Sequence, residues 1–284
     1  MARRPDRLII NREEPDPFPT LYVEANEDSC GVGAWVPRIK HTQLCKYIDS
    51  AYAAARSAKW PGGWVYLDPF CSSGRIRVVG ETKTRPGGSL LAWRQSQFSG
   101  TPFRKVLIGD IDAERLGACE ARLKAAGAPV QSFNLPAVES VERMVRELPK
   151  GALCLAYVDP YKIGVLAFEI FRLLAKVQVD VIVNFFSSDL RRNVEHTRDE
   201  LNPGWRDRLG EQMNKSRLAA AWFEDWQDQV KALGFRMSTS MQTVPNSKNS
   251  EMYRLVFFAK RSFPIGLWDD VSADPTPDLF KDGL

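Results

Sequence analysis

Three predicted strands of this chain each end in an aspartate, at a point where an acid can do chemistry. Asp68 closes the apolar run in YLDPFCSSGR (66–75), Asp110 follows VLIG (106–109), and Asp159 follows ALCLAYV (152–158). In an open α/β sheet, ligands bind beyond the carboxyl ends of the strands, near the switch in strand order. The three acids are therefore candidates for one shared ligand site.

The turn after Asp68 is built from small residues. Cys71, Ser72 and Ser73 let backbone N–H groups approach a ligand closely, and Gly74 can adopt a positive φ angle. This pattern is typical of a turn that holds a cofactor, but a tight strand-to-helix turn with a capping aspartate fits it equally well. The cofactor-binding candidates in this turn are Asp68, Phe70, Cys71, Ser72 and Gly74.

The second strand ends in Asp110, Ile111 and Asp112. An acid at this place in a dinucleotide-binding fold hydrogen-bonds the ribose hydroxyls of an adenosine cofactor. We therefore assign Asp110, with its neighbour Ile111, to cofactor binding. Asp112 precedes a helical stretch and is expected to be its N-cap.

The third strand end carries Asp159, Pro160 and Tyr161, which we take as the catalytic candidates. Enzymes that methylate exocyclic amines of bases place an acid or amide, a proline and an aromatic residue in this order. The acid accepts a hydrogen bond from the amine and the ring stacks on a base that has left its own stack. Such enzymes carry two prolines where this chain has one, and the alternative is that Tyr161 packs on a neighbouring loop. Asp159 is also a candidate for contact with the cofactor.

Two polar segments follow strands and could bind a substrate. The loop 75–88 carries four bases and one acid, which suits phosphate contacts, although a solvated loop explains it as well. The segment 187–206 nearly balances acids and bases, and there Asp189 is expected to join a polar network. The substrate candidates in the two segments are Arg75, Arg77, Lys83, Arg85, Arg191, Arg192 and Asn193.

Strands and helices must alternate to bring these residues together. Apolar runs that are not interrupted by polar positions predict strands buried on both faces, and helical spacing of apolar residues separates them. We predict an α/β fold, a doubly wound and mostly parallel sheet closed by a C-terminal antiparallel strand pair. The predicted strands are 64–68, 104–110, 152–159, 179–186, 235–244 and 252–260, and the predicted helices include 38–58, 113–126, 165–176 and 218–233.

Composition narrows the class of protein. The 284 residues are 44% hydrophobic, which supports a large core, and no run of 18 apolar residues predicts a membrane span. The N-terminus lacks the apolar region of a secretory signal. Five dispersed cysteines without a CxxC, and only two histidines, suggest a reduced cytoplasmic protein without a metal site. A net charge of +4 permits nucleic-acid binding without requiring it.

We expect one main domain. Residues 1–34 are predicted to be an irregular N-terminal arm and 269–284 a tail. The domain between them, 35–268, carries insertions at 75–88 and 187–217.

Several segments together resemble a known family. They are WVPRIKHTQLCKYI (35–48), YLDPFCSSGR (66–75), GGSLLA (87–92), VDPYKIGVL (158–166), VDVIVNFFSSDLRRNV (179–194), PGWR (203–206) and YRLVFFAK (253–260). The order of elements resembles the class I S-adenosylmethionine-dependent methyltransferase fold. More closely, the chain is similar to the three-Cys-motif partner proteins, named for neighbouring genes whose products carry a radical-type three-cysteine motif.

This resemblance implies S-adenosylmethionine as cofactor and methyl transfer to nucleic acid or a nucleotide base. The alternative is a non-catalytic partner or scaffold of a radical-SAM-type or defence-associated protein. Two departures from the family pattern bear on this choice. Phe70 and Cys71 stand where small residues are commoner, and Asn134 replaces the acid that often meets the adenine amine. Because an asparagine amide can still hydrogen-bond, Asn134 remains a cofactor-binding candidate.

Overall fold

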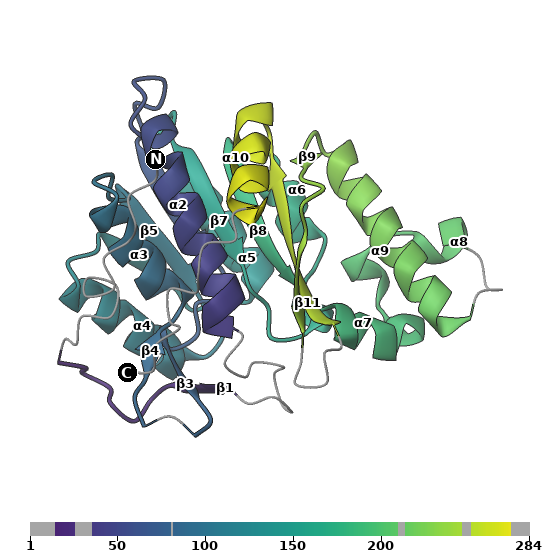
Figure 1. The fold of residues 1–284 in the computed structure, drawn as a ribbon, viewed down its shortest axis with the longest axis horizontal. Coiled ribbons are helices and arrows are strands. Elements are labelled where there is room, and N and C mark those ends of the chain that lie inside the picture. The colour runs from purple at the N-terminus through teal and green to yellow at the C-terminus, as the bar shows by residue number, and fades with distance from the viewer. Residues whose placement is uncertain (1–14, 26–35, 81, 210–213, 246–250, 274–284) are drawn as a thin grey trace.

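The computed structural model of the protein describes residues 15–25, 36–80, 82–209, 214–245 and 251–273 (Figure 1). Its centre is a sheet in the order β10-β11-β8-β7-β2-β5-β6, with β9 pairing to β11. The strands are β2 (Trp64–Asp68), β5 (Lys105–Gly109), β6 (Val130–Phe133), β7 (Leu153–Val158), β8 (Val179–Phe185), β9 (Arg236–Met237), β10 (Gln242–Pro245) and β11 (Glu251–Ala259).

Strands β2, β5, β6, β7 and β8 run parallel, whereas β11 is antiparallel to both β8 and β10. After β2 the chain adds β5 and β6 on one side of this strand, and then β7 and β8 on the other side. The switch in strand order therefore falls between β2 and β7. The predicted fold, a doubly wound and mostly parallel sheet with a C-terminal antiparallel pair, is confirmed.

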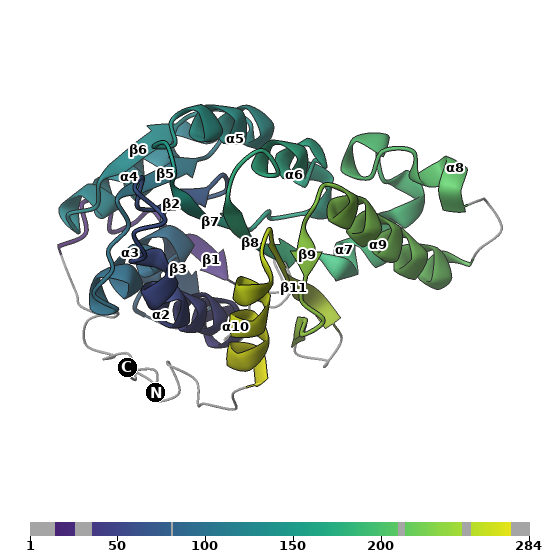
Figure 2. The same ribbon diagram turned by 90° about the horizontal axis from the view of Figure 1, so that it is seen from above.

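Helices cover both faces of the sheet (Figure 2). One face carries α2 (Thr42–Ala55), α3 (Gly88–Phe98), α4 (Ala113–Ala125) and α10 (Ser262–Ala273); the other carries α5 (Ala137–Arg146), α6 (Glu169–Leu174), α7 (Ser187–Asn193) and α9 (Lys215–Ala232). Every residue of β2, β7 and β8 is buried. Strands covered on both sides explain the uninterrupted apolar runs in the sequence. Among the described residues, no helix has the length and apolar character needed to cross a membrane.

The predicted irregular arm contains a strand. Within 1–34, β1 (Val23–Ala25) pairs in parallel with β3 (Arg75–Val78), which pairs with β4 (Arg85–Pro86) in a separate small sheet. Three residues are too few to show the alternation of apolar and polar side chains that is typical of a strand. The rest of the arm, 1–14 and 26–34, lies outside the described residues.

Helix boundaries differ from prediction at three places. A π-helix (Val36–His41) precedes α2. The helix predicted at 165–176 shortens to α6, because the N–H of Ile163 bonds Asp189 and the N–H of Phe168 bonds the Glu200 carbonyl instead of a helical partner. The proline-rich end of the chain holds α10, which buries Trp268 parallel to the Phe257 ring, with centroids 4.8 Å apart.

Candidate functional site

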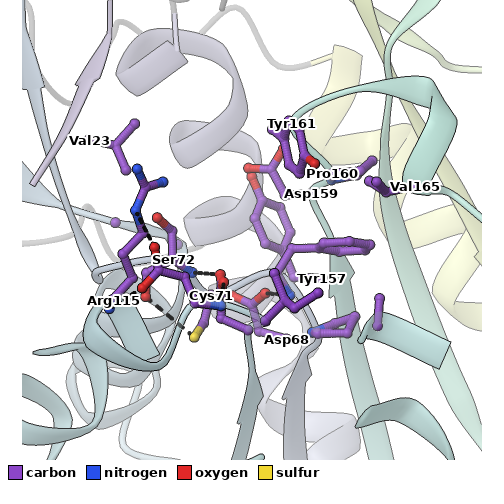
Figure 3. A pocket seen from close by; sticks show the side chains of 18 of the residues that line it. Val23, Asp68, Cys71, Ser72, Arg115, Tyr157, Asp159, Pro160, Tyr161 and Val165 are labelled. Carbon is purple, nitrogen blue, oxygen red and sulfur yellow. Dashed lines mark hydrogen bonds and ion pairs between the residues drawn. The ribbon is translucent and has the colours of Figure 1, made fainter. Parts of the chain in front are cut away.

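A cavity of about 890 Å³ opens at the carboxyl ends of the parallel strands, over the switch between β2 and β7 (Figure 3). The size suits a small-molecule or cofactor site. All three strand-end acids line it. The sequence-predicted residues in its wall are Asp68, Phe70, Cys71, Ser72, Gly74, Arg75, Asp110, Ile111, Asp159, Pro160 and Tyr161.

The turn after β2 has the strained backbone that its small residues suggested. Gly74 has φ +75°, and a Cβ there would lie 2.9 Å from the Cys119 sulfur. Ser72 has φ 50°, which is uncommon for a residue other than glycine. The Cys71 N–H bonds the Gly109 carbonyl, which ties this turn to the end of β5.

Asp68 is buried beneath this turn. Its carboxylate accepts hydrogen bonds from the Ser89 hydroxyl at 2.5 Å, the Phe70 N–H at 3.0 Å and the Tyr66 hydroxyl at 3.3 Å. Burial raises the pKa of Asp68 to about 7, although the Ser89 and Phe70 bonds oppose this. Asp68 therefore titrates near neutral pH and shapes the floor of the cavity.

Asp110 joins the two turns. One of its oxygens accepts the Ser72 N–H at 2.9 Å and the other accepts the Asp112 N–H at 2.9 Å. Each carboxylate oxygen can still accept a second hydrogen bond. Beside Asp110, the Ile111 side chain is 72% exposed at the cavity wall. Asp112 accepts from the N–H groups of Glu114 and Arg115, so its predicted role as N-cap is confirmed.

Asp159 is held by two buried side chains that the sequence did not single out. Its Oδ1 accepts from the Lys40 ammonium at 2.7 Å and from the Asn184 amide at 2.8 Å. Lys40 lies in the π-helix before α2, and Asn184 is the polar residue near the end of β8. The only signal for Asn184 was an amide inside an apolar strand; for Lys40 there was none.

Two further side chains near Asp159 were also not predicted from the sequence. His41 lines the cavity, and burial together with the Lys40 charge lowers the His41 pKa to about 4, so its ring is neutral at pH 7. Tyr157 lies buried between Asp68 and Asp159; burial and both carboxylates raise its pKa. Among the described side chains, its hydroxyl is one of the buried polar groups without a hydrogen-bond partner.

Tyr161 stands at the rim of the cavity with 63% of its surface exposed. Its contact is with Lys162, whose ammonium lies 5.2 Å from the ring centroid. The ring is open to a ligand, so the alternative in which it packs on a neighbouring loop is not what the structure shows.

The other predicted site residues do not line the cavity. Asn134 donates to the carbonyls of Asp110 and Ile111, both at 3.0 Å, and so braces the β5 turn. Arg77 pairs with Glu24, and Arg191 with Glu251. Asn193 donates to Asp189 at 2.6 Å. Lys83, Arg85 and Arg192 also do not line the cavity, although the charge of Arg85 acts on His41 in its wall.

Two of the four bases in the loop 75–88 thus form ion pairs with acids of the N-terminal arm. Arg75, which does reach the cavity, pairs with Asp16 at 3.2 Å. Within the described part of the chain, no group of three His, Cys, Asp or Glu side chains could hold a metal ion.

No protein-family model matches this sequence, and no curated protein matches it. Among solved structures, protein LPL1258 from Legionella pneumophila is similar over 83% of this chain and 90% of its own, with 12% identity and a TM-score of 0.51. An O-methyltransferase from Bacillus cereus in complex with SAH matches over 78% of this chain and 81% of its own, with 10% identity and a TM-score of 0.42. The first likeness shows a shared α/β fold and no more.

Proposed function

We propose that this protein is an S-adenosylmethionine-dependent methyltransferase whose acceptor is an amine nitrogen on a nucleic acid or nucleotide base. The observation that carries the proposal is the meeting of Asp68, Asp110 and the Asp159-Pro160-Tyr161 sequence around one cavity at the sheet switch. The first two suit an adenosine cofactor and the third suits a planar amine.

The cavity wall fits the cofactor's parts. Asp110 can accept from ribose hydroxyls, and the exposed Ile111 side chain offers an apolar surface for the adenine ring. Gly87 and Gly88 line the cavity where α3 begins, and free N–H groups at a helix start favour a carboxylate. A Cβ at Gly88 would lie 2.9 Å from the Tyr157 ring, so a larger residue would crowd this wall.

The cofactor, when bound, supplies an electrophilic methyl group. The protein's own part is to orient the acceptor amine: Asp159 accepts an amine N–H through the oxygen that Lys40 and Asn184 leave open, and Tyr161 stacks on the acceptor ring. The unpartnered Tyr157 hydroxyl can donate to a ligand in the same place.

Transfer of labelled methyl groups to RNA, DNA and free nucleotides tests this function. Asp159→Ala should abolish transfer and leave cofactor affinity nearly intact, because Asp159 acts on the acceptor. Asp228→Ala, on the exposed face of α9, is the matched control and should transfer normally. Full transfer by Asp159→Ala would refute the role of Asp159.

A non-catalytic partner of a radical-SAM-type three-Cys-motif protein is the second candidate. Two observations favour it. Lys40 already binds Oδ1 of Asp159, and Asn134 does not line the cavity. Methyl transfer by the purified chain alone would rule it out.

A further inference from the structure

The described part of the N-terminal arm, residues 15–25, lies against the cavity. Tyr22, Val23 and Glu24 line it, and β1 is fixed to the loop after the first turn by pairing Val23 with Ile76. Figure 3 shows Val23 on the same side of the cavity as Ser72 and Arg115, where the adenosine of a cofactor is proposed to lie. This segment, here called the strap, is therefore part of the cavity wall.

One buried arginine joins the strap to the candidate cofactor turn. Arg122 on α4 is 3% exposed. Its guanidinium donates to both carboxylate oxygens of Asp16, at 2.8 and 3.0 Å, and to the carbonyls of Phe18 at 2.6 Å and Leu21 at 2.8 Å. It also donates to the carbonyl of Ser73 in the turn.

The contacts of Arg122 do more than neutralise its charge. Bidentate bonds to a carboxylate are among the strongest and most directional in proteins, and here they fix the strap at one point. Arg75 adds a second ion pair to Asp16 at 3.2 Å. Arg77 binds the far end of the strap by pairing with Glu24 and stacking 4.3 Å above the Tyr22 ring.

The N-terminal end of the strap has few apolar contacts to hold it. Pro15, Pro17 and Phe18 are exposed, and the strand at its end is three residues long. Segments with few buried apolar contacts open locally at much lower cost than the core. Release of Asp16 from Arg122 would therefore loosen the N-terminal end of the strap without unfolding the sheet, while β1 stays paired with β3.

We propose that Arg122 is a positioning residue for the cavity: by fastening the strap to the turn after β2, it holds the cavity wall formed by Tyr22, Val23 and Glu24 in place and slows the release of a bound ligand. The identity of that ligand as an adenosine cofactor rests on the function proposed above. Arg122 does not line the cavity; it acts through the Ser73 carbonyl in the turn after β2 and through Asp16 in the strap.

Dissociation of S-adenosylhomocysteine, followed by stopped-flow, tests the proposal. Asp16→Ala should speed dissociation about tenfold or more, because it removes charge-assisted bonds. Asp228→Ala, which removes an exposed ion pair with Lys231 on α9, should leave the rate unchanged. An unchanged rate in Asp16→Ala, with hydrogen exchange showing the strap released, would overturn the proposal.

A second readout needs no ligand. Cys71 lines the cavity, whereas Cys45 and Cys154 lie in the core. Peptide-resolved labelling with N-ethylmaleimide should modify Cys71 faster in Asp16→Ala than in the wild type, and should leave the labelling of Cys45 and Cys154 unchanged. An equal rate of Cys71 labelling in the two proteins would refute the role proposed for the strap. If Cys45 and Cys154 also react, the variant has unfolded, and the milder Asp16→Asn replaces it in the same comparison. Failure of the wild type to bind S-adenosylhomocysteine would count against the proposed function alone, since the labelling result still decides the strap.

Discussion

Asp159 is held in place by a buried charge partner. Lys40 is 5% exposed, so its ammonium has lost most of its water and depends on the carboxylate 2.7 Å away. Removing one member of a buried pair leaves the other charge without compensation, which costs more than the pair itself contributes. Asp159 and Lys40 are therefore expected to behave as one unit.

A double-mutant cycle measures the coupling free energy between Asp159 and Lys40. Lys40→Met should lower the free energy of unfolding by about 2–5 kcal/mol, because it leaves Asp159 charged with only the Asn184 amide. Adding Asp159→Asn should recover much of the loss, since no unpaired charge remains. Denaturant unfolding gives the values, and strictly additive effects of the two changes would contradict the coupling.

At the scale of elements, the turn after β2 depends on its contact with α4. Gly74→Ala places an alanine at a backbone position with φ +75°, and its Cβ would also lie 2.9 Å from the Cys119 sulfur. Gly127 has nearly the same φ angle, +77°, with no atom within 4 Å of the added Cβ. The two positions therefore separate backbone strain from the close approach of the turn to the helix.

Gly127→Ala should cost about 1–2 kcal/mol of stability from the backbone alone. Gly74→Ala should cost more, and should also weaken ligand binding because the turn must shift. Thermal unfolding of both variants, with ligand titration of each, makes the comparison. Equal losses of stability with equal ligand affinity would show that the contact with Cys119 is unimportant.

The elements that the sequence predicted best are those with continuous apolar runs. Strand β2 begins and ends at the predicted residues, and the Asp68, Asp110 and Asp159 ends meet because parallel strands share an edge. The contacts that escaped prediction join distant parts of the chain. Lys40 reaches Asp159 across 119 residues, and Arg122 reaches Asp16 across 106. Neither residue differs by type or spacing from an ordinary solvated base on a helix.

For the whole molecule, buried carboxyl groups set the pH dependence of stability. Asp180 lies in the centre of the sheet, where burial raises its pKa to about 6 against the hydrogen bond from Tyr47 at 2.8 Å. The folded state therefore binds this proton more tightly than the unfolded state, whose pKa is 3.8. The stability that the neutral group provides is full below pH 3.8 and is lost as the pH rises through about 6.

Asp180→Asn should remove this dependence. Between pH 4 and 7, the free energy of unfolding of the wild type should fall relative to the variant by on the order of 3 kcal/mol. The asparagine oxygen still accepts from Tyr47, so the packing is preserved. Parallel stability curves for the two proteins over this range would show that Asp180 does not titrate as described.

The central claim is that the cavity at the β2–β7 switch binds an adenosine cofactor, and calorimetric titration with S-adenosylmethionine and S-adenosylhomocysteine tests it most directly. We expect a dissociation constant near the micromolar range, about 8 kcal/mol, for the wild type and the Asp228→Ala control, with binding lost in Asp68→Ala and Asp110→Ala. Absence of binding to the folded wild type, or undiminished binding in both cavity variants, would contradict the account.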